Sequence, residues 1–314
     1  EAMFTFMNTA RLGTAVQGVC HAEAAFQGAL PYAKERRSMR ALSGKKEPEA
    51  KADALIWHPD VRRMLLTQKA IAEGGRAMIY DALKIGDQMF NAAATGDEAA
   101  YKQFDGELGF YTPILKGFLT EMGLEAANLG VQVFGGHGYI KEHGMEQIVR
   151  DARISTLYEG TTGIQALDLL GRKVLMGSKG KCVRDFTLEM VRFARPHLLR
   201  RTPLGAMARN LAARAAEWNL LTTAIMLRAP KDREVVGAAS VDYLMYSGFV
   251  MMGYYWAVQA AKAEELLASG QGKESEDFYR SKVQTAEFYF ERLMPRANAH
   301  RTGALAPTRS VMQL

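Results

Sequence analysis

The feature that most constrains the fold is the length over which apolar residues recur at helical spacing. Between about residues 58 and 94, apolar side chains return every three or four positions, as on one face of an α-helix. The members of this face are Val61, Met64, Leu65, Ile71, Ala72, Gly75, Met78, Ile79, Leu83, Gly86, Met89 and Phe90. Proline, which interrupts helices, makes up only 9 of 314 residues, and we find no strand-like alternation of useful length. The sequence therefore predicts an all-α protein.

Several other stretches carry the same helical spacing. Helices are expected over residues 2–37, 97–134, 145–153, 162–175, 183–200, 204–229, 233–269 and 276–299. Asp97 stands where a helix needs an N-cap. Residues 43–53, rich in Lys and containing Pro, are expected to form a loop, and residues 176–180 a linker. We therefore expect a four-helix bundle domain over 1–178 and an additional C-terminal helical domain over 179–314.

One segment has the length of a membrane span. Residues 243–261 carry no charge, and about 19 residues are close to the length that crosses a bilayer. The segment nevertheless contains Ser247 and Gln259, and Asp242 and Lys262 flank it inside a longer helical pattern. We predict a buried core helix and no transmembrane span. A membrane-peripheral anchor built from this segment is the weaker alternative.

Charge and cysteine content exclude some classes of function. The net charge is +6 and the isoelectric point about 9.2, but the basic residues are scattered, as on solvated helix faces. The basic residues are compatible with an anionic ligand such as a coenzyme A ester or a dinucleotide. The sequence has no basic run with interleaved aromatic residues, so nucleic-acid binding is not expected. Cys20 and Cys182 lie far apart, so we expect no disulfide framework and no metal site. A reducing, cytoplasmic location is predicted.

The stretch after residue 131 contains a glycine-rich turn. Gly135, Gly136 and Gly138 allow the backbone to approach a ligand closely, and such a turn can hold a phosphate or an adenine dinucleotide. A tight connection between two helices would use the same residues. The turn is not a Rossmann fingerprint, because no strand precedes it and the spacing differs.

Glu159 is the second candidate for chemistry. It follows Leu157 and Tyr158 and stands just before Gly160 and the expected start of a helix. A carboxylate in this place commonly interacts with the helix N-terminus. In a pocket that is closed to water, the same carboxylate can act as a general base. The residues alone leave both roles open.

A family resemblance covers about residues 3–175. The C-terminal signature of the acyl-CoA dehydrogenase family is similar to residues 132–173, QVFGGHGYIKEHGMEQIVRDARISTLYEGTTGIQALDLLGRK. The family's segment that reaches across a dimer to the flavin resembles residues 32–39, YAKERRSM. The start of its long helix that lines the acyl-CoA site resembles residues 7–11, MNTAR.

The C-terminal region resembles a long subgroup of this family. Members of the subgroup carry an added helical domain, which would correspond to about residues 180–314. Residues 57–65 and 166–173 are most similar to 3-methylmercaptopropionyl-CoA dehydrogenases and related fatty acyl-CoA dehydrogenases. The family's N-terminal helical domain and middle β-domain would precede Glu1, so we expect this chain to be the C-terminal part of a longer enzyme.

The resemblance implies oxidation of an acyl-CoA to its trans-2-enoyl-CoA. A carboxylate removes the α-proton while a hydride leaves the β-carbon for FAD, and an electron-transferring flavoprotein is the usual electron acceptor. Glu159 would be the base, and its backbone N–H would polarise the thioester oxygen. Some members place the base beside the residue that matches Arg11, but Ala10 stands there and cannot take a proton.

The resemblance also implies the binding residues. The cofactor-binding residues would be Arg36, Met39, Gln132, Gly135, Gly136 and Thr161, and the substrate-binding residues Asn8, Arg11 and Gly160. Arg36 and Met39 would come from one subunit of a homodimer and the remaining cofactor residues from its mate. Met39, Pro59 and Gly163 depart from the residues common in the family. Without the upstream domains, we expect this chain to bind FAD weakly or not at all and to be inactive.

A different class of function remains open from the sequence. The chain would then be a noncatalytic helical module for dimerisation or interaction, in which the signature residues are kept for packing.

Overall fold

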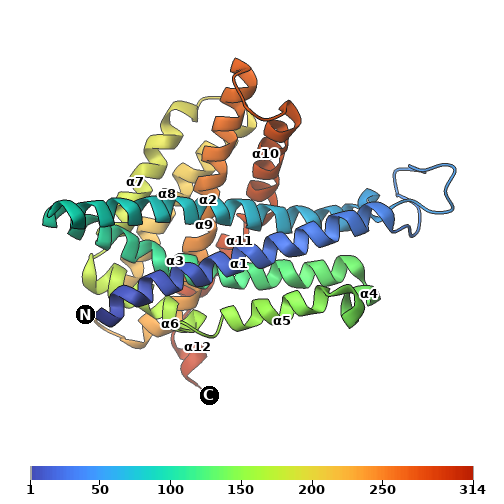
Figure 1. Ribbon diagram of the computed structural model, residues 1–314. Coiled ribbons are helices and arrows are strands. Elements are labelled where there is room, and N and C mark those ends of the chain that lie inside the picture. The colour runs from blue at the N-terminus through green and yellow to red at the C-terminus, as the bar shows by residue number, and fades with distance from the viewer. Residues whose placement is uncertain (1, 314) are drawn as a thin grey trace.

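The computed structural model describes residues 2–313, with side chains from residue 10 to residue 313. Within this range the ordered elements are helices, and the single backbone bridge, between Arg37 and Ala54, does not extend into a strand. The predicted all-α class is confirmed (Figure 1).

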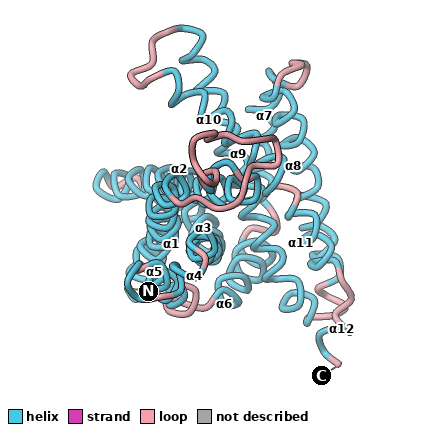
Figure 2. The backbone as a smooth tube through the Cα atoms, turned by 90° about the vertical axis from the view of Figure 1, so that its right-hand side faces the viewer, coloured by secondary structure: helices cyan, strands magenta, loops and turns pink. Residues whose placement is uncertain are grey.

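Three long helices form the first part of the chain. They are α1 (Ala2–Glu35), α2 (Pro59–Thr95), which follows the 3-10 turn η1 (Leu55–Trp57), and α3 (Glu98–Phe134). The chain then turns back through α4 (Gly136–Tyr139), η2 (Lys141–His143), α5 (Met145–Ser155), α6 (Thr162–Leu167) and the π-helical turn η3 (Asp168–Gly177). Figure 2, which looks nearly along these helices, shows α1, α3 and α5 packed side by side.

The second part of the chain crosses the first. It comprises α7 (Lys181–Ala194), η4 (Arg195–His197), α8 (Pro203–Arg228), α9 (Glu234–Ser269), α10 (Glu276–Phe288), η5 (Tyr289–Leu293), α11 (Arg296–Leu305) and α12 (Arg309–Met312). In Figure 1, α7 to α10 run across the direction of α1 to α3. Contacts of α9 with α2, α3 and α6 join the two parts.

Local chemistry explains several helix boundaries. Asp97 caps α3 as expected, because its carboxylate accepts from the Ala100 N–H at 3.0 Å. The helix predicted over 183–200 ends earlier, at Ala194, where the sequence reaches Pro196. The helix predicted over 276–299 is interrupted by η5 and Pro295. Proline lacks an N–H and clashes with the preceding turn, so it ends regular hydrogen bonding at both places.

Glycines allow α1 and α3 to pack closely. A Cβ placed on Gly18 would overlap the backbone of Leu119, and one placed on Gly123 would overlap the backbone of Gly18. The two helices therefore approach through their backbones at this crossing. This close packing holds the two helices that carry Arg11 and Lys116 at a fixed separation.

One hydrophobic core runs through both parts of the chain, from Leu12 in α1 to Ala304 in α11. Helix α9 lies at its centre, and its Trp256 Nε1 donates to the carbonyl oxygen of Ala70 in α2 at 3.0 Å. By length and composition α9 could cross a membrane, but 72% of its apolar window is buried inside the protein. That burial is what the predicted core helix requires. The domain boundary near residue 178 stays a prediction, because the core is continuous across it.

Candidate active site

The glycine-rich turn packs against the end of α1. The ring of Tyr32 stacks on Phe134, with 4.0 Å between ring centroids, and its hydroxyl lies 2.8 Å from Nδ1 of His137. Arg36 and Met39 follow the end of α1, and Gly135 follows the end of α3, so they lie at the end of the bundle where Tyr32 contacts Phe134. A second subunit is therefore not needed to bring these two segments together.

The candidate cofactor residues at this end face outward. Arg36, Met39, Gln132, Gly135 and Gly136 are all exposed. Gly135 has a φ of 62°, and a Cβ on either glycine would meet nothing within 4 Å. Among the described residues we find no hydrogen bond or ion pair from the side chains of Arg36 and Gln132. An arginine, an amide and an open glycine turn suit a phosphate-bearing dinucleotide, so these residues fit part of an FAD molecule.

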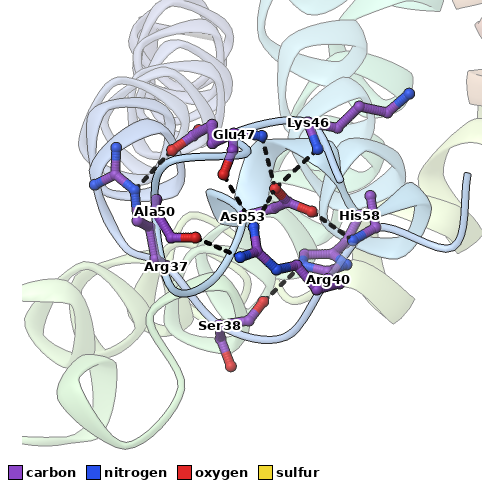
Figure 3. Close-up of polar contacts among 9 residues, drawn as sticks. Arg37, Ser38, Arg40, Lys46, Glu47, Ala50, Asp53 and His58 are labelled. Carbon is purple, nitrogen blue, oxygen red and sulfur yellow. Dashed lines mark hydrogen bonds and ion pairs between the residues drawn. The ribbon is translucent and has the colours of Figure 1, made fainter. Parts of the chain in front are cut away.

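Asp53 organises the loop that follows Arg36. Its buried carboxylate accepts from the backbone N–H groups of Ala41 at 2.8 Å, Glu47 at 2.9 Å and Lys46 at 3.0 Å, and from Arg40 at 3.2 Å. Figure 3 shows Arg40, Lys46 and Glu47 around Asp53. The bonds, led by that from Ala41, hold the pKa of Asp53 well below its usual range despite burial. The loop therefore has a defined shape around a charged centre.

The backbone at Glu159 adopts an uncommon conformation. Glu159 has a φ of 54° and Gly160 a φ of 89°, and a left-handed conformation is unusual for a residue with a Cβ. Both carbonyl oxygens of this pair are bonded, that of Glu159 by Gln165 Nε2 at 2.9 Å and that of Gly160 by Lys116 Nζ at 2.5 Å. The turn is therefore held from two helices, α6 and α3.

The functional groups of Glu159 remain free for a ligand. The residue is half-buried, and within the described part of the chain neither its carboxylate nor its backbone N–H has a hydrogen-bond partner. A half-buried carboxylate beside an unused amide donor can accept a proton and stabilise a nearby oxyanion. The alternative capping role is not what the structure shows, because Thr161 caps α6 through its side-chain oxygen, 3.4 Å from Ile164 N.

Thr161 and Glu159 lie away from the glycine-rich turn. They precede α6, whereas Gly135 precedes α4 and Gly136 begins it, and α5 separates the two places along the chain (Figure 1). The structure thus divides the predicted cofactor residues into two groups. Arg36, Met39, Gln132 and the two glycines form one, and Thr161 belongs to the other.

Arg11 is engaged inside the protein. Its guanidinium donates to Asp168 Oδ2 at 3.1 Å, and both side chains are buried. Arg172 also donates to Asp168. Burial acts to raise the pKa of Asp168, but the hydrogen bond from Arg172 and the charges of Arg172 and Arg11 lower it below its usual value. Arg11 therefore lies behind the Glu159 turn rather than on an open path. The side chain of Asn8, the other residue predicted on that path, lies outside the described residues.

Sequence reasoning missed Lys116, Gln165 and Asp168. Lys116 is fully buried on α3, and burial lowers the pKa of its ammonium to about 8, although the nearby carboxylates of Glu121 and Glu159 oppose the shift. The position of this lysine between Leu115 and Phe118, within an apolar stretch, was the feature of the sequence that could have indicated a buried charged residue. Nothing in the sequence placed it against Gly160, 44 residues away.

A cavity of about 590 Å³ lies between α3 and α7, and none of the residues of the Glu159 turn lines it. Its walls include the carboxylates of Glu107, Asp185 and Glu189. Burial and the neighbouring Glu189, Asp81 and Asp185 raise the pKa of Glu107. Acidic walls repel the phosphates of a coenzyme A ester, so the candidate active site remains at Glu159.

A helical bundle that presents a free carboxylate from a constrained turn, with a dinucleotide-compatible glycine turn at its other end, suits one half of a cofactor-dependent enzyme. Residues 1–175 match the family model described as acyl-CoA dehydrogenase, C-terminal domain. Residues 186–314 match the model described as acetyl-CoA dehydrogenase C-terminal like. The chain belongs to the acyl-CoA dehydrogenase family.

Curated relatives support this placement. The chain is 39% identical over 304 residues to 3-methylmercaptopropionyl-CoA dehydrogenase of Ruegeria pomeroyi, which covers 96% of this chain and 49% of the relative. It is 29% identical to a broad-specificity linear acyl-CoA dehydrogenase of Mycobacterium tuberculosis, over 99% of this chain and 51% of the relative. The chain therefore spans about half the length of the curated relatives it matches. The predicted family resemblance is confirmed.

A solved structure shares the fold. An acyl-CoA dehydrogenase from Bacillus anthracis complexed with FAD superposes with a TM-score of 0.72 at 17% identity, over 99% of this chain and 52% of that chain. At this identity the match shows the arrangement of helices and not the chemistry.

Proposed function

We propose that this chain supplies the catalytic base and part of the FAD site of an acyl-CoA dehydrogenase that forms a trans-2-enoyl-CoA. The observation that carries the proposal is the Glu159 turn, in which a strained backbone is bonded at both carbonyl oxygens while the carboxylate and the N–H stay free. A carboxylate kept only for packing or capping would use its oxygens within the protein. Names of the matched relatives include acyl-CoA dehydrogenases, which supports the same substrate class.

The chain's own residues would act on the α-carbon of the thioester. Glu159 takes the α-proton, and the electrons of that C–H bond form the new double bond to the β-carbon. The free N–H of Glu159 donates to the thioester oxygen, which gains negative charge as the proton leaves. FAD, when bound, accepts the hydride that leaves the β-carbon. An electron-transferring flavoprotein is the proposed acceptor of those electrons.

The two groups of cofactor residues support a homodimer. Met39 and Leu42 are 76% and 95% exposed on the loop that Asp53 organises, and exposed apolar residues on an ordered loop favour contact with another protein surface. We propose that the group containing Arg36 and Gly135 serves a cofactor shared with a second copy. Light scattering should then show a dimer at micromolar concentration, and a monomer alone would contradict this assignment.

The catalytic proposal is tested in the flavin-loaded enzyme that contains this chain. Glu159→Gln keeps the shape of the side chain but removes the base, so turnover with an acyl-CoA should fall by about 100- to 10,000-fold while flavin absorbance stays unchanged. Glu98→Gln, at an exposed pair with Lys102, is the matched control and should keep the wild-type rate. If Glu159→Gln retains more than about a tenth of that rate, Glu159 is not the base.

A further inference from the structure

Lys116 is buried next to the candidate base, and its position is not explained by packing. Its side chain is fully buried, yet it carries an amine that must be removed from water. An apolar residue would fill the same site on α3 without that desolvation. Within the described residues its Nζ donates to one acceptor, the carbonyl oxygen of Gly160 at 2.5 Å. An ammonium has three N–H donors, and the Gly160 carbonyl is the acceptor that this turn supplies to one of them.

The contact acts on the backbone that sets the direction of Glu159. Gly160 has a φ of 89°, and Glu159 itself has a φ of 54°. Glycine adopts a positive φ readily, whereas the left-handed backbone of Glu159 persists only where surrounding groups hold it. Gln165 holds the carbonyl oxygen of Glu159 and Lys116 that of Gly160, so the peptide groups before and after Gly160 are both fixed.

We propose that Lys116 is a positioning residue for Glu159, whose backbone it holds through Gly160 and whose carboxylate it faces with a positive charge. This inference rests on the proposed role of Glu159 as the base. It adds a pH dependence to that role, because the charge facing the carboxylate disappears when Lys116 loses its proton.

The charges around Lys116 define where this change occurs. Arg11 on α1, Glu121 on α3 and Glu159 on the turn face it. Burial lowers the pKa of Lys116 to about 8, Glu121 and Glu159 oppose the shift, and Arg11 adds to it. Glu121 also accepts from the Thr162 hydroxyl at 2.5 Å, so the same charges reach the start of α6. A change at Lys116 between pH 7 and pH 9 would therefore be felt at Gly160 and at Thr162, which closely follow Glu159.

The first test uses the wild-type 314-residue chain and NMR of its side chains. The ¹³C resonance of the Glu159 carboxyl, assigned with Glu159→Gln, is followed from pH 6.5 to 9.5 beside the Cε resonance of Lys116. We expect both resonances to change with the same midpoint, near pH 8. A Glu159 resonance that stays constant while Lys116 titrates would overturn the proposal. Glu159→Gln has to fold only for the assignment, and the titration itself is followed in the wild-type chain.

The second test measures hydrogen exchange in residues 157–164. Lys116→Met removes the donor, and loss of one hydrogen bond should lower protection there by about tenfold. Lys116→Gln keeps an N–H donor without the charge, and its protection should lie between that of the wild type and that of Lys116→Met. Lys102→Met, at an exposed position of the same helix, should change nothing. Wild-type protection in a folded Lys116→Met chain would overturn the proposal, whatever Glu159→Gln does to turnover.

Discussion

Arg11 Nη1 donates to Asp168 Oδ2 at 3.1 Å, and this buried ion pair ties α1 to η3, the π-helical turn that follows the Glu159 segment. The side chains of Arg11 and Asp168 are only 6% and 8% exposed. Two segments separated by 157 residues are thereby joined inside the protein. The pair is a structural support of the site rather than a part of its open face.

Removal of one partner should be strongly destabilising. Asp168→Asn keeps the shape of the side chain but leaves the Arg11 charge buried without its partner, so the free energy of unfolding should fall by about 3 to 5 kcal/mol. Urea denaturation followed by circular dichroism measures this change. Glu98→Gln, at an exposed pair, should change it by less than about 1 kcal/mol. If Asp168→Asn lowers the free energy of unfolding as little as Glu98→Gln does, the buried Arg11–Asp168 pair contributes little to stability.

Stability should also depend on pH through Lys116. Its pKa is lowered by burial from 10.5 to about 8, so between these values the unfolded chain binds the proton and the folded chain does not. The contribution of Lys116 to the free energy of unfolding should therefore rise with pH across this window, by about 3 kcal/mol at most. Urea unfolding of the wild type and Lys116→Met at pH 7.5 and pH 10 tests this. An identical pH response of the two proteins would contradict it.

The loop around Asp53 should depend on that carboxylate. Asp53→Asn removes the charge that three backbone N–H groups and Arg40 share, so the loop should open more often. Limited trypsin digestion at Lys46 and Lys51 should become about tenfold faster, while the helical circular dichroism stays unchanged. The control is Asp60→Asn, whose carboxylate is exposed and pairs with Arg63. Cleavage at the wild-type rate would mean that other contacts hold the loop.

The chain by itself should bind FAD weakly or not at all. Arg36, Gln132 and the glycine turn are exposed groups that can contact only part of the cofactor, so little of its surface would be buried. Gel filtration after mixing with FAD should give a colourless protein peak. A yellow protein after that step would show that this chain already holds the flavin ring.

The sequence by itself determined the helical class, most helix positions and the family. Helical periodicity, caps such as Asp97 and breaks at proline are local properties, and the family signature around Glu159 is read from neighbouring residues. The candidate base, Glu159, is therefore indicated by the sequence alone.

Only the tertiary structure decided how that residue is held. The left-handed backbone at Glu159, its bonds from Gln165 and Lys116, and the burial of Arg11 against Asp168 depend on the close packing of α1, α3 and α6. The Lys116 side chain meets a carbonyl oxygen 44 residues away, and Arg11 meets a side chain 157 residues away, because tertiary packing brings their segments together. Burial and charge environment arise from that packing, and no local pattern contains them.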